Sequence, residues 1–464
     1  MSNLPPDRAA AALVAVQLPG VTDVDHAADL AELGRLVHTL GHEVVATVTQ
    51  RRSALAAAAV LGEGKLKQLA ALTGGDGIVP SGAPEKKDKA RKKRSAAEAD
   101  DAPAEPEEDE DGGDGPGPAP PRKVTVIVVD HEISPSQARN LERATGAEVL
   151  DRTGVIVEIF HRHAKSREAK LEVEIARLNY VAPRLREGGA GADRQRGGIG
   201  GKGAGESAIE LDKRKIRDRI AELREELAAI QKEQGVRRAQ RRDARRVALV
   251  GYTNAGKSSL MRALTGSDVL VADKLFATLD TTVRALHPET KPRVLVSDTV
   301  GFIKKLPHDL VASFRSTLDE ALEASLLLYV ADASDPTFRA QLEVTRATLA
   351  EIGADAVPSR LLLNKVDRLD AEARAALAAE HPEAILLSAK DAGDVAALRL
   401  TILAFFEATM VDGELLVPYA KQNLVGEIYE AARVVSEAYD EGGRRLTVRA
   451  HPEAMARLTS LLAR

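Results

Sequence analysis

One eight-residue stretch limits the possible folds of this chain more than any other feature. Residues 251–258 match the phosphate-binding pattern G-x-x-x-x-G-K-[ST] at every fixed position, between an apolar run at 247–250 and a helical pattern that begins near 257. In such a strand–loop–helix unit, backbone N–H groups and the helix N-terminus surround a triphosphate, the lysine contacts the β- and γ-phosphates, and the serine hydroxyl ligates Mg²⁺. We therefore expect an α/β nucleotide-binding domain whose phosphate loop consists of Gly251, Tyr252, Thr253, Asn254, Ala255, Gly256, Lys257 and Ser258.

Two later segments indicate which base is bound. Asn-Lys-Val-Asp at 364–367 follows an apolar run at 359–363, and Ser-Ala-Lys at 388–390 follows another at 384–387. A carboxylate at Asp367 can accept hydrogen bonds from N1–H and the N2 amino group of guanine, whereas adenine has no such donor pair on that edge. The Lys365 stem can cover the base while its ammonium stays in water. Together they predict binding of GTP and GDP by Asn364, Lys365, Val366, Asp367, Ser388, Ala389 and Lys390.

Two further segments are expected to contact the γ-phosphate and its metal ion. The first, which ends an apolar run at 293–297, consists of Asp298, Thr299, Val300 and Gly301. Asp298 is expected to hold Mg²⁺ through a water molecule, and the Gly301 N–H to contact the γ-phosphate. The second, upstream, consists of Phe276, Ala277, Thr278, Leu279 and Asp280, followed by Thr281 and Thr282. One threonine here should complete the magnesium shell, and the residue types alone do not choose among the three.

The residue after Gly301 predicts slow intrinsic hydrolysis. Many switch GTPases have a water-orienting Gln there, whereas this chain has Phe302, which can neither donate nor accept the hydrogen bonds required. The catalytic group is therefore unknown from the sequence. It comes from another residue of this chain or from a partner, and partner-supplied groups are worth about 10³ to 10⁵ in rate.

Several of these segments closely resemble the HflX GTPases of bacteria, and the resemblance covers nearly the whole chain apart from residues 81–123. It rests on 252–255, 276–280, 298–316, 61–65, 130–150 and Asp151-Arg152-Thr153. The resemblance implies a GTPase that associates with the large ribosomal subunit and its rRNA and can separate the subunits of stalled ribosomes. It also implies that Thr278 is the switch ligand of Mg²⁺, with Ser258 as the second. One departure is Gly203-Ala204-Gly205-Glu206, where the family usually has Gly-Pro-Gly-Glu; without Pro the loop is less constrained.

Length and composition predict a cytoplasmic, multidomain and monomeric enzyme. The chain of 464 residues is long enough for three or four domains, and it contains no Cys. No apolar stretch reaches the ~18 residues of a membrane span, and the N-terminus has no secretory apolar region. We therefore expect no membrane span. The net charge of -5 averages over segments of opposite sign and does not exclude an RNA partner.

The N-terminal domain is expected at residues 1–161, with strands alternating with helices around a parallel sheet. Within it, residues 81–122 form a charged insertion, basic in its first half and acidic in its second, whose composition predicts disorder. The segment Gly62-Glu63-Gly64-Lys65 suggests a second nucleotide site, but its spacing does not match a phosphate loop. We favour a turn that opens a helix.

Residues 162–246 are expected to form an antiparallel helical hairpin. Its helices, near 166–185 and 209–231, carry one apolar face each: Leu171, Ile175 and Leu178, and Ile216, Ile220, Leu223, Leu227 and Ile230. The connection at 188–203 is rich in Gly and contains Arg194, Arg196 and Lys202, which indicates a tip that contacts rRNA phosphates. Six arginines at 237–246 form a basic linker that is also expected to contact RNA.

The GTPase domain is expected at 247–410, with its last helix at 398–407. A small α+β domain is expected at 411–464, with a helix at 422–433. The overall prediction is an α/β multidomain GTPase at the large ribosomal subunit. Three alternatives remain: a GTPase of large-subunit assembly, an rRNA-remodelling NTPase that uses ATP through the N-terminal domain, and a regulatory switch that does not bind RNA. Binding to precursors of the large subunit rather than to mature ribosomes would indicate the assembly GTPase. ATP-driven activity that survives Asp367→Asn would indicate the rRNA-remodelling NTPase.

Overall fold

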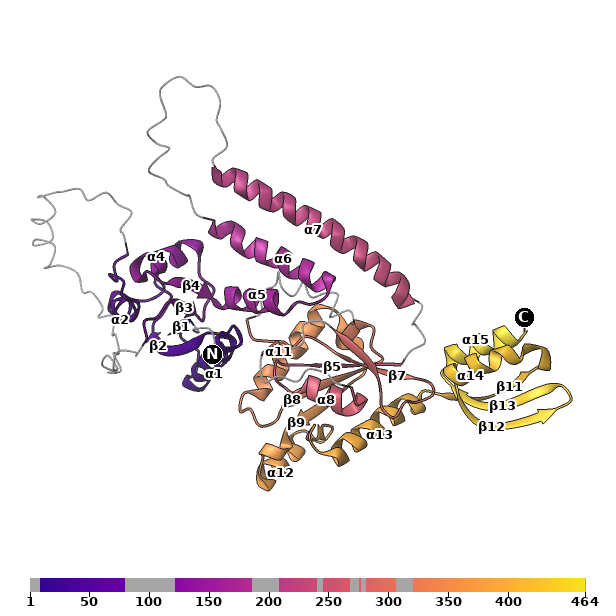
Figure 1. Cartoon of the computed structure of the whole chain (residues 1–464). Coiled ribbons are helices and arrows are strands. Elements are labelled where there is room, and N and C mark those ends of the chain that lie inside the picture. Colours follow the sequence, from indigo (N-terminus) through magenta and orange to yellow (C-terminus); the bar gives the residue numbers. More distant parts are fainter. Residues whose placement is uncertain are drawn as a thin grey trace, which may run out of the picture. The chain divides into compact units, whose positions relative to one another are not determined.

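The computed structural model describes residues 9–79, 122–185, 208–239, 245–267, 275–276, 281–305 and 320–463. The predictions for the charged insertion, the glycine-rich tip and residues 277–280 of the switch segment lie outside these ranges. The chain divides into two compact units, Met1–Ile159 and Phe160–Arg464, and each is described by itself (Figure 1).

The first unit contains a four-stranded sheet in the order β2-β1-β3-β4, with every neighbouring pair parallel, as predicted. Its central strands consist of apolar residues because helices cover a parallel sheet on both faces. The predicted turn at Gly62 is the N-terminus of α2. The elements are β1 (Ala10–Gln17), α1 (Asp23–Thr39), β2 (Glu43–Arg51), α2 (Glu63–Thr73), β3 (Val126–Val129), α4 (Pro135–Thr145), β4 (Glu148–Asp151) and α5 (Arg152–His163).

The predicted hairpin consists of α6 (Arg167–Val181), followed by a short 3₁₀ turn (Ala182–Arg184), and α7 (Ala208–Ala239). Ile175, Ile220 and Leu223 are buried between the two helices, which confirms the apolar faces read from the sequence. The predicted end of the second helix at 231 is wrong. The helix continues to Ala239 because Lys, Glu, Gln and Arg after 231 are good helix formers, so part of the expected basic linker is helical.

The domain expected at 247–410 has a six-stranded sheet in the order β10-β9-β8-β5-β7-β6, in which only β6 is antiparallel to its neighbour among the described strands. The carboxyl ends of its parallel strands lie at one edge, where α/β folds bind ligands. The strands are β5 (Arg245–Gly251), β6 (Thr282–Ala285), β7 (Val294–Asp298), β8 (Leu326–Asp332), β9 (Ser359–Asn364) and β10 (Ile385–Leu386).

Helices flank this sheet and bury its apolar residues (Figure 1). They are α8 (Lys257–Thr265), α11 (Phe338–Glu351), α12 (Ala371–Glu380) and α13 (Ala392–Ala408), with 3₁₀ turns at Ala354–Ala356 and Val366–Arg368. The last helix begins six residues before the predicted start at 398. Its N-cap is Asp391, whose side chain accepts a hydrogen bond from the backbone N–H of Asp394.

The C-terminal part contains an antiparallel sheet in the order β11-β13-β12. The helix predicted at 422–433 is wrong in its bounds. Lys421 has a non-helical φ of -116° inside a 3₁₀ segment (Tyr419–Leu424), and the α-helix α14 is only Val425–Ala431. The other elements are β11 (Val411–Val417), β12 (Arg433–Asp440), β13 (Gly443–Ala450) and α15 (Pro452–Ala463). Among the helices in the described ranges, none has the length and apolar character to cross a membrane.

Candidate nucleotide site

The phosphate loop follows β5 and turns into α8, and two of its glycines are required by space as well as by conformation. Gly251 has φ +153°, and a Cβ there would lie 2.2 Å from the carbonyl oxygen of Val330. Gly256 has φ +100°, and a Cβ there would lie 2.2 Å from Nδ2 of Asn364. Only glycine fits both positions, and the close approach at 256 brings the loop against the base-binding segment.

Lys257 is held inside the loop that it completes. Its Nζ donates to the carbonyl oxygens of Gly251 at 3.0 Å and Tyr252 at 2.9 Å, and only 6% of the residue is exposed. Burial lowers the pKa of this ammonium to about 8, although the nearby carboxylate of Asp298 opposes the shift. An arriving phosphate would restore a full countercharge to it.

Two oxygen groups suited to a hard cation meet beside this lysine. Ser258 Oγ donates to Oδ2 of Asp298 at 2.6 Å, and Asp298 is fully buried at the end of β7. Hydroxyl and carboxylate oxygens with substrate phosphates are the ligands that Mg²⁺ uses in nucleotide sites. In the described residues no cluster of three or more His, Cys, Asp or Glu side chains suggests a metal site made by protein alone. The pair therefore fits an ion that arrives with the nucleotide.

The segment after Asp298 runs along the phosphate loop. Thr253 N–H donates to the carbonyl oxygen of Phe302 at 2.8 Å, and Phe302 N–H donates to that of Gly251 at 3.1 Å. The hydroxyl of Tyr252 accepts from the N–H of Lys304 at 2.7 Å. The Phe302 side chain is buried, with 3% of the residue exposed. Backbone contacts thus place Gly301 at the loop, and the side chain next to it is apolar.

The base-binding side is organised by Asn364 and Asp367. Asn364 Nδ2 donates to the carbonyl oxygen of Ala255 at 2.9 Å, and its Oδ1 accepts from the N–H of Ala389 at 3.1 Å. Asp367 Oδ1 accepts from Ser388 Oγ at 2.8 Å, and Lys390 Nζ lies 3.6 Å from its other oxygen. These contacts lower the pKa of Asp367, the Ser388 hydrogen bond most, so the carboxylate remains charged, as its predicted contact with guanine requires.

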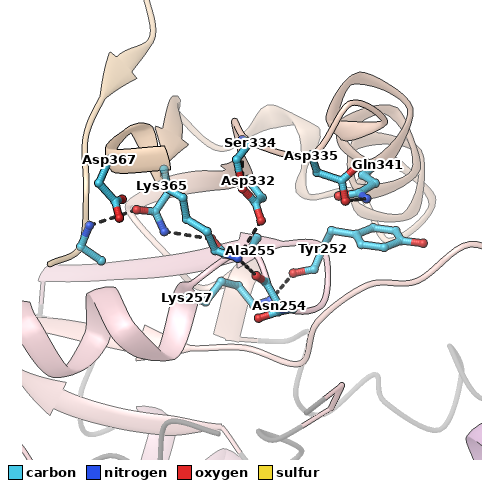
Figure 2. A network of polar contacts seen from close by, with 12 residues as sticks. Tyr252, Asn254, Ala255, Lys257, Asp332, Ser334, Asp335, Gln341, Lys365 and Asp367 are labelled. Atoms are coloured by element: carbon cyan, nitrogen blue, oxygen red, sulfur yellow. Dashed lines mark hydrogen bonds and ion pairs between the residues drawn. The ribbon is translucent and has the colours of Figure 1, made fainter. Parts of the chain in front are cut away.

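The expectation that the Lys365 ammonium stays in water is wrong. Its Nζ donates to the carbonyl oxygen of Asn254 at 2.7 Å and to Oδ2 of Asp332 at 2.6 Å, and its side chain is 15% exposed (Figure 2). Asp332 is held in turn by the N–H of Ser334 at 3.0 Å and its hydroxyl at 2.6 Å. Lys365 therefore links the base-binding segment to the phosphate loop, and its ion pair with Asp332 positions its ammonium group.

Asp332 contacts a predicted site residue, Lys365, and was not predicted from the sequence. It ends β8, which lies between β5, the strand before the phosphate loop, and β9, the strand that ends at Asn364. A charged residue at the carboxyl end of that strand was a usable signal, because those ends meet at the ligand-binding edge.

Not every predicted site residue directs its side chain to the nucleotide. Thr299 Oγ1 donates to the carbonyl oxygen of Leu249 at 2.8 Å, and Val366 packs in an apolar cluster with Leu363. Phe276 is buried and has φ +57°. Ala277, Thr278, Leu279 and Asp280 lie outside the described residues. In the described part of the chain, Thr281 Oγ1 is buried without a hydrogen-bond partner. Which threonine ligates Mg²⁺ therefore stays a prediction.

Three family profiles match consecutive parts of the chain. They are described as GTP-binding GTPase N-terminal, at residues 27–78 and 119–161, GTP-binding GTPase Middle Region, at 163–241, and 50S ribosome-binding GTPase, at 246–365. A solved structure titled as SsGBP in complex with GDP covers 86% of this chain and 98% of its own at 22% identity, with a TM-score of 0.45.

Two bacterial relatives match over most of their length. GTPase HflX of Gluconacetobacter diazotrophicus is 65% identical over 454 residues, which are 98% of each chain. GTPase HflX of Escherichia coli (strain K12) is 40% identical over 323 residues, 69% of this chain and 76% of that one. With this identity, the three matching profiles and the guanine-nucleotide geometry, the chain belongs to the HflX family of GTPases and is a GTP hydrolase.

Proposed function

We propose that this GTPase binds the large ribosomal subunit through its rRNA and uses GTP binding and hydrolysis to separate the subunits of stalled ribosomes. It acts as a cytoplasmic monomer with slow intrinsic hydrolysis. The observation that carries the proposal is a well-formed guanine-nucleotide site beside a buried phenylalanine. Phe302 provides no polar side-chain atom where a water-orienting group is needed, so fast turnover requires a group from elsewhere.

The ribosome is the partner that several features favour. The profile at 246–365 is described as a 50S ribosome-binding GTPase. The helices α6 and α7 pack along Ile175, Ile220 and Leu223, so they form a firm support for the segment that joins them. That segment contains Arg194, Arg196 and Lys202 among many glycines, which suits close contact with an RNA backbone.

Mg²⁺ is proposed as the cofactor that accompanies GTP. Ser258 would hold it directly and Asp298 through water, while Thr278 is proposed as the switch ligand on the family resemblance. When bound, the ion neutralises charge on the β- and γ-phosphates. The short Ser258–Asp298 hydrogen bond keeps both oxygens in place before the nucleotide arrives.

The deciding experiment measures GTP turnover by the full chain with and without purified large subunits at physiological salt. We expect a stimulation of about 10³-fold or more, in the range of partner-supplied groups. Small subunits serve as the control partner. The Asp367→Asn variant controls for contaminating GTPases, because an amide there cannot accept both of the hydrogen bonds expected from guanine.

Subunit separation is tested by sedimentation of associated ribosomes with the protein and a non-hydrolysable GTP analogue. A shift from associated particles to free subunits is expected, and an unchanged profile contradicts separation. Turnover without stimulation, despite intact GTP binding, contradicts activation by the ribosome. Preferential binding to large-subunit precursors would favour the assembly alternative, and ATP turnover that survives Asp367→Asn would favour RNA remodelling.

A further inference from the structure

Thr253, the third residue of the phosphate loop, has a buried hydroxyl whose bonding capacity is unused. Only 7% of the residue is exposed, and within the described part of the structure Oγ1 has no hydrogen-bond partner. Most buried polar atoms in native proteins have one, because leaving them unsatisfied costs free energy. A bound ligand would supply the hydrogen-bond partner that the hydroxyl lacks.

The methyl group of Thr253 packs against Gly301, which places the residue beside the groups expected at the γ-phosphate. A Cβ placed on Gly301 would lie 2.8 Å from both Cα and Cγ2 of Thr253, and 3.1 Å from Nζ of Lys257. The backbone N–H of Thr253 is committed to the carbonyl oxygen of Phe302 at 2.8 Å. Lys257 and the Gly301 N–H are the two groups expected at the γ-phosphate. Thr253 and Lys257 both lie beside Gly301.

The chemistry of the group matches that position. A threonine hydroxyl can donate one hydrogen bond, and the oxygens of a γ-phosphate are charged acceptors. GDP has no oxygen of this kind beyond its β-phosphate. Phe302 supplies no polar side-chain atom, whereas Thr253, beside Gly301, carries a hydroxyl that can donate.

Resting on the proposed GTP cycle, we propose that Thr253 Oγ1 donates a hydrogen bond to a γ-phosphate oxygen and makes the site prefer GTP over GDP. It is a specificity residue for the nucleotide state, in addition to the backbone N–H groups of the loop. A purely structural role makes a different prediction: packing of the Thr253 methyl group against Gly301 would be kept by valine.

The test compares Thr253→Val, which keeps the branched shape without the hydroxyl, with Thr253→Ser, which keeps the hydroxyl without the methyl. Displacement of fluorescent GDP from the full chain by GDP and by a non-hydrolysable GTP analogue gives both affinities. For Val we expect unchanged GDP affinity and about tenfold to 150-fold weaker binding of the analogue, the value of one hydrogen bond to a charged group. For Ser we expect analogue binding within about threefold of wild type.

Each other outcome overturns the inference. If Val retains the wild-type ratio of GTP-analogue to GDP affinity, the hydroxyl does not recognise the γ-phosphate. If Val weakens both nucleotides equally, Thr253 only shapes the loop. A thermal melt without nucleotide distinguishes misfolding, because removing an unsatisfied buried hydroxyl should leave the melting temperature of the Val variant equal or higher. Failure of the proposed function looks different: large ribosomal subunits would leave the GTP turnover of the wild type unchanged, while the ratio of GTP-analogue to GDP affinity would still separate the Val and Ser variants.

Discussion

Replacing Asp332 by Asn should weaken the binding of both GDP and GTP, because Asp332 positions Lys365. The carboxylate uses Oδ2 for the Lys365 ammonium and Oδ1 for the N–H and hydroxyl of Ser334. The side chain of Asn has only one oxygen, so it can accept either from Lys365 or from Ser334. In either orientation its amide NH₂ meets a donor, so one of the two contacts is lost.

The size of the effect follows from the burial of the pair. Asp332 and Lys365 side chains are 14% and 15% exposed, and their atoms are 2.6 Å apart. A hydrogen bond to a charged group at such a place contributes about 1.5–3 kcal/mol. If positioning of Lys365 depends on it, the affinity for nucleotide falls about tenfold to 150-fold. GDP and GTP should be affected alike, because Lys365 contacts the base side and the carbonyl oxygen of Asn254.

The assay is the dissociation rate of fluorescent GDP, in which the loss should show as faster release. The matched control is Asp335→Asn, three residues along, whose carboxylate accepts instead from Thr337 and Gln341 (Figure 2). A cycle with Lys365→Met tests the mechanism, since Asp332→Asn should have little further effect in that background. Equal dissociation rates for wild type and Asp332→Asn, or fully additive losses, would refute the reasoning.

Three further predictions concern the same site. Asp367→Asn should exchange GTP for xanthosine triphosphate in a turnover assay, because the amide can donate to the C2 carbonyl of xanthine; unchanged use of GTP contradicts the guanine role. Lys257, with its pKa of about 8, must be protonated to meet a phosphate, and the phosphate raises that pKa. GDP affinity without Mg²⁺ should therefore be flat below pH 8 and fall as pH rises above it; calorimetry at about pH 8.5 in buffers of different ionisation enthalpy should show uptake of about three quarters of a proton, and no buffer dependence contradicts this. Gly256→Ala places a Cβ 2.2 Å from Asn364 Nδ2 at φ +100°, so nucleotide binding by filter retention should be lost, and retained binding contradicts the steric argument.

Much of the architecture was predictable because its signals are local. Apolar runs and their spacing predicted the parallel N-terminal sheet, the hairpin faces and the strands that precede each nucleotide-binding segment. The phosphate loop and the Asn-Lys-Val-Asp segment are short, so their residue types and order along the chain were enough to predict a GTP site. Helix ends were less certain: α7 ran past 231 and α13 began at its Asp391 cap.

Only the tertiary structure decided how these segments cooperate. Asp332 and Lys365 are 33 positions apart in the chain, and their ion pair exists because β8 and β9 are neighbours in the sheet. The unsatisfied hydroxyl of Thr253 likewise depends on the segment after Gly301 lying against the loop. Sequence patterns report what one segment can bind, whereas burial, pairing and pKa depend on which distant groups are brought within a few ångströms.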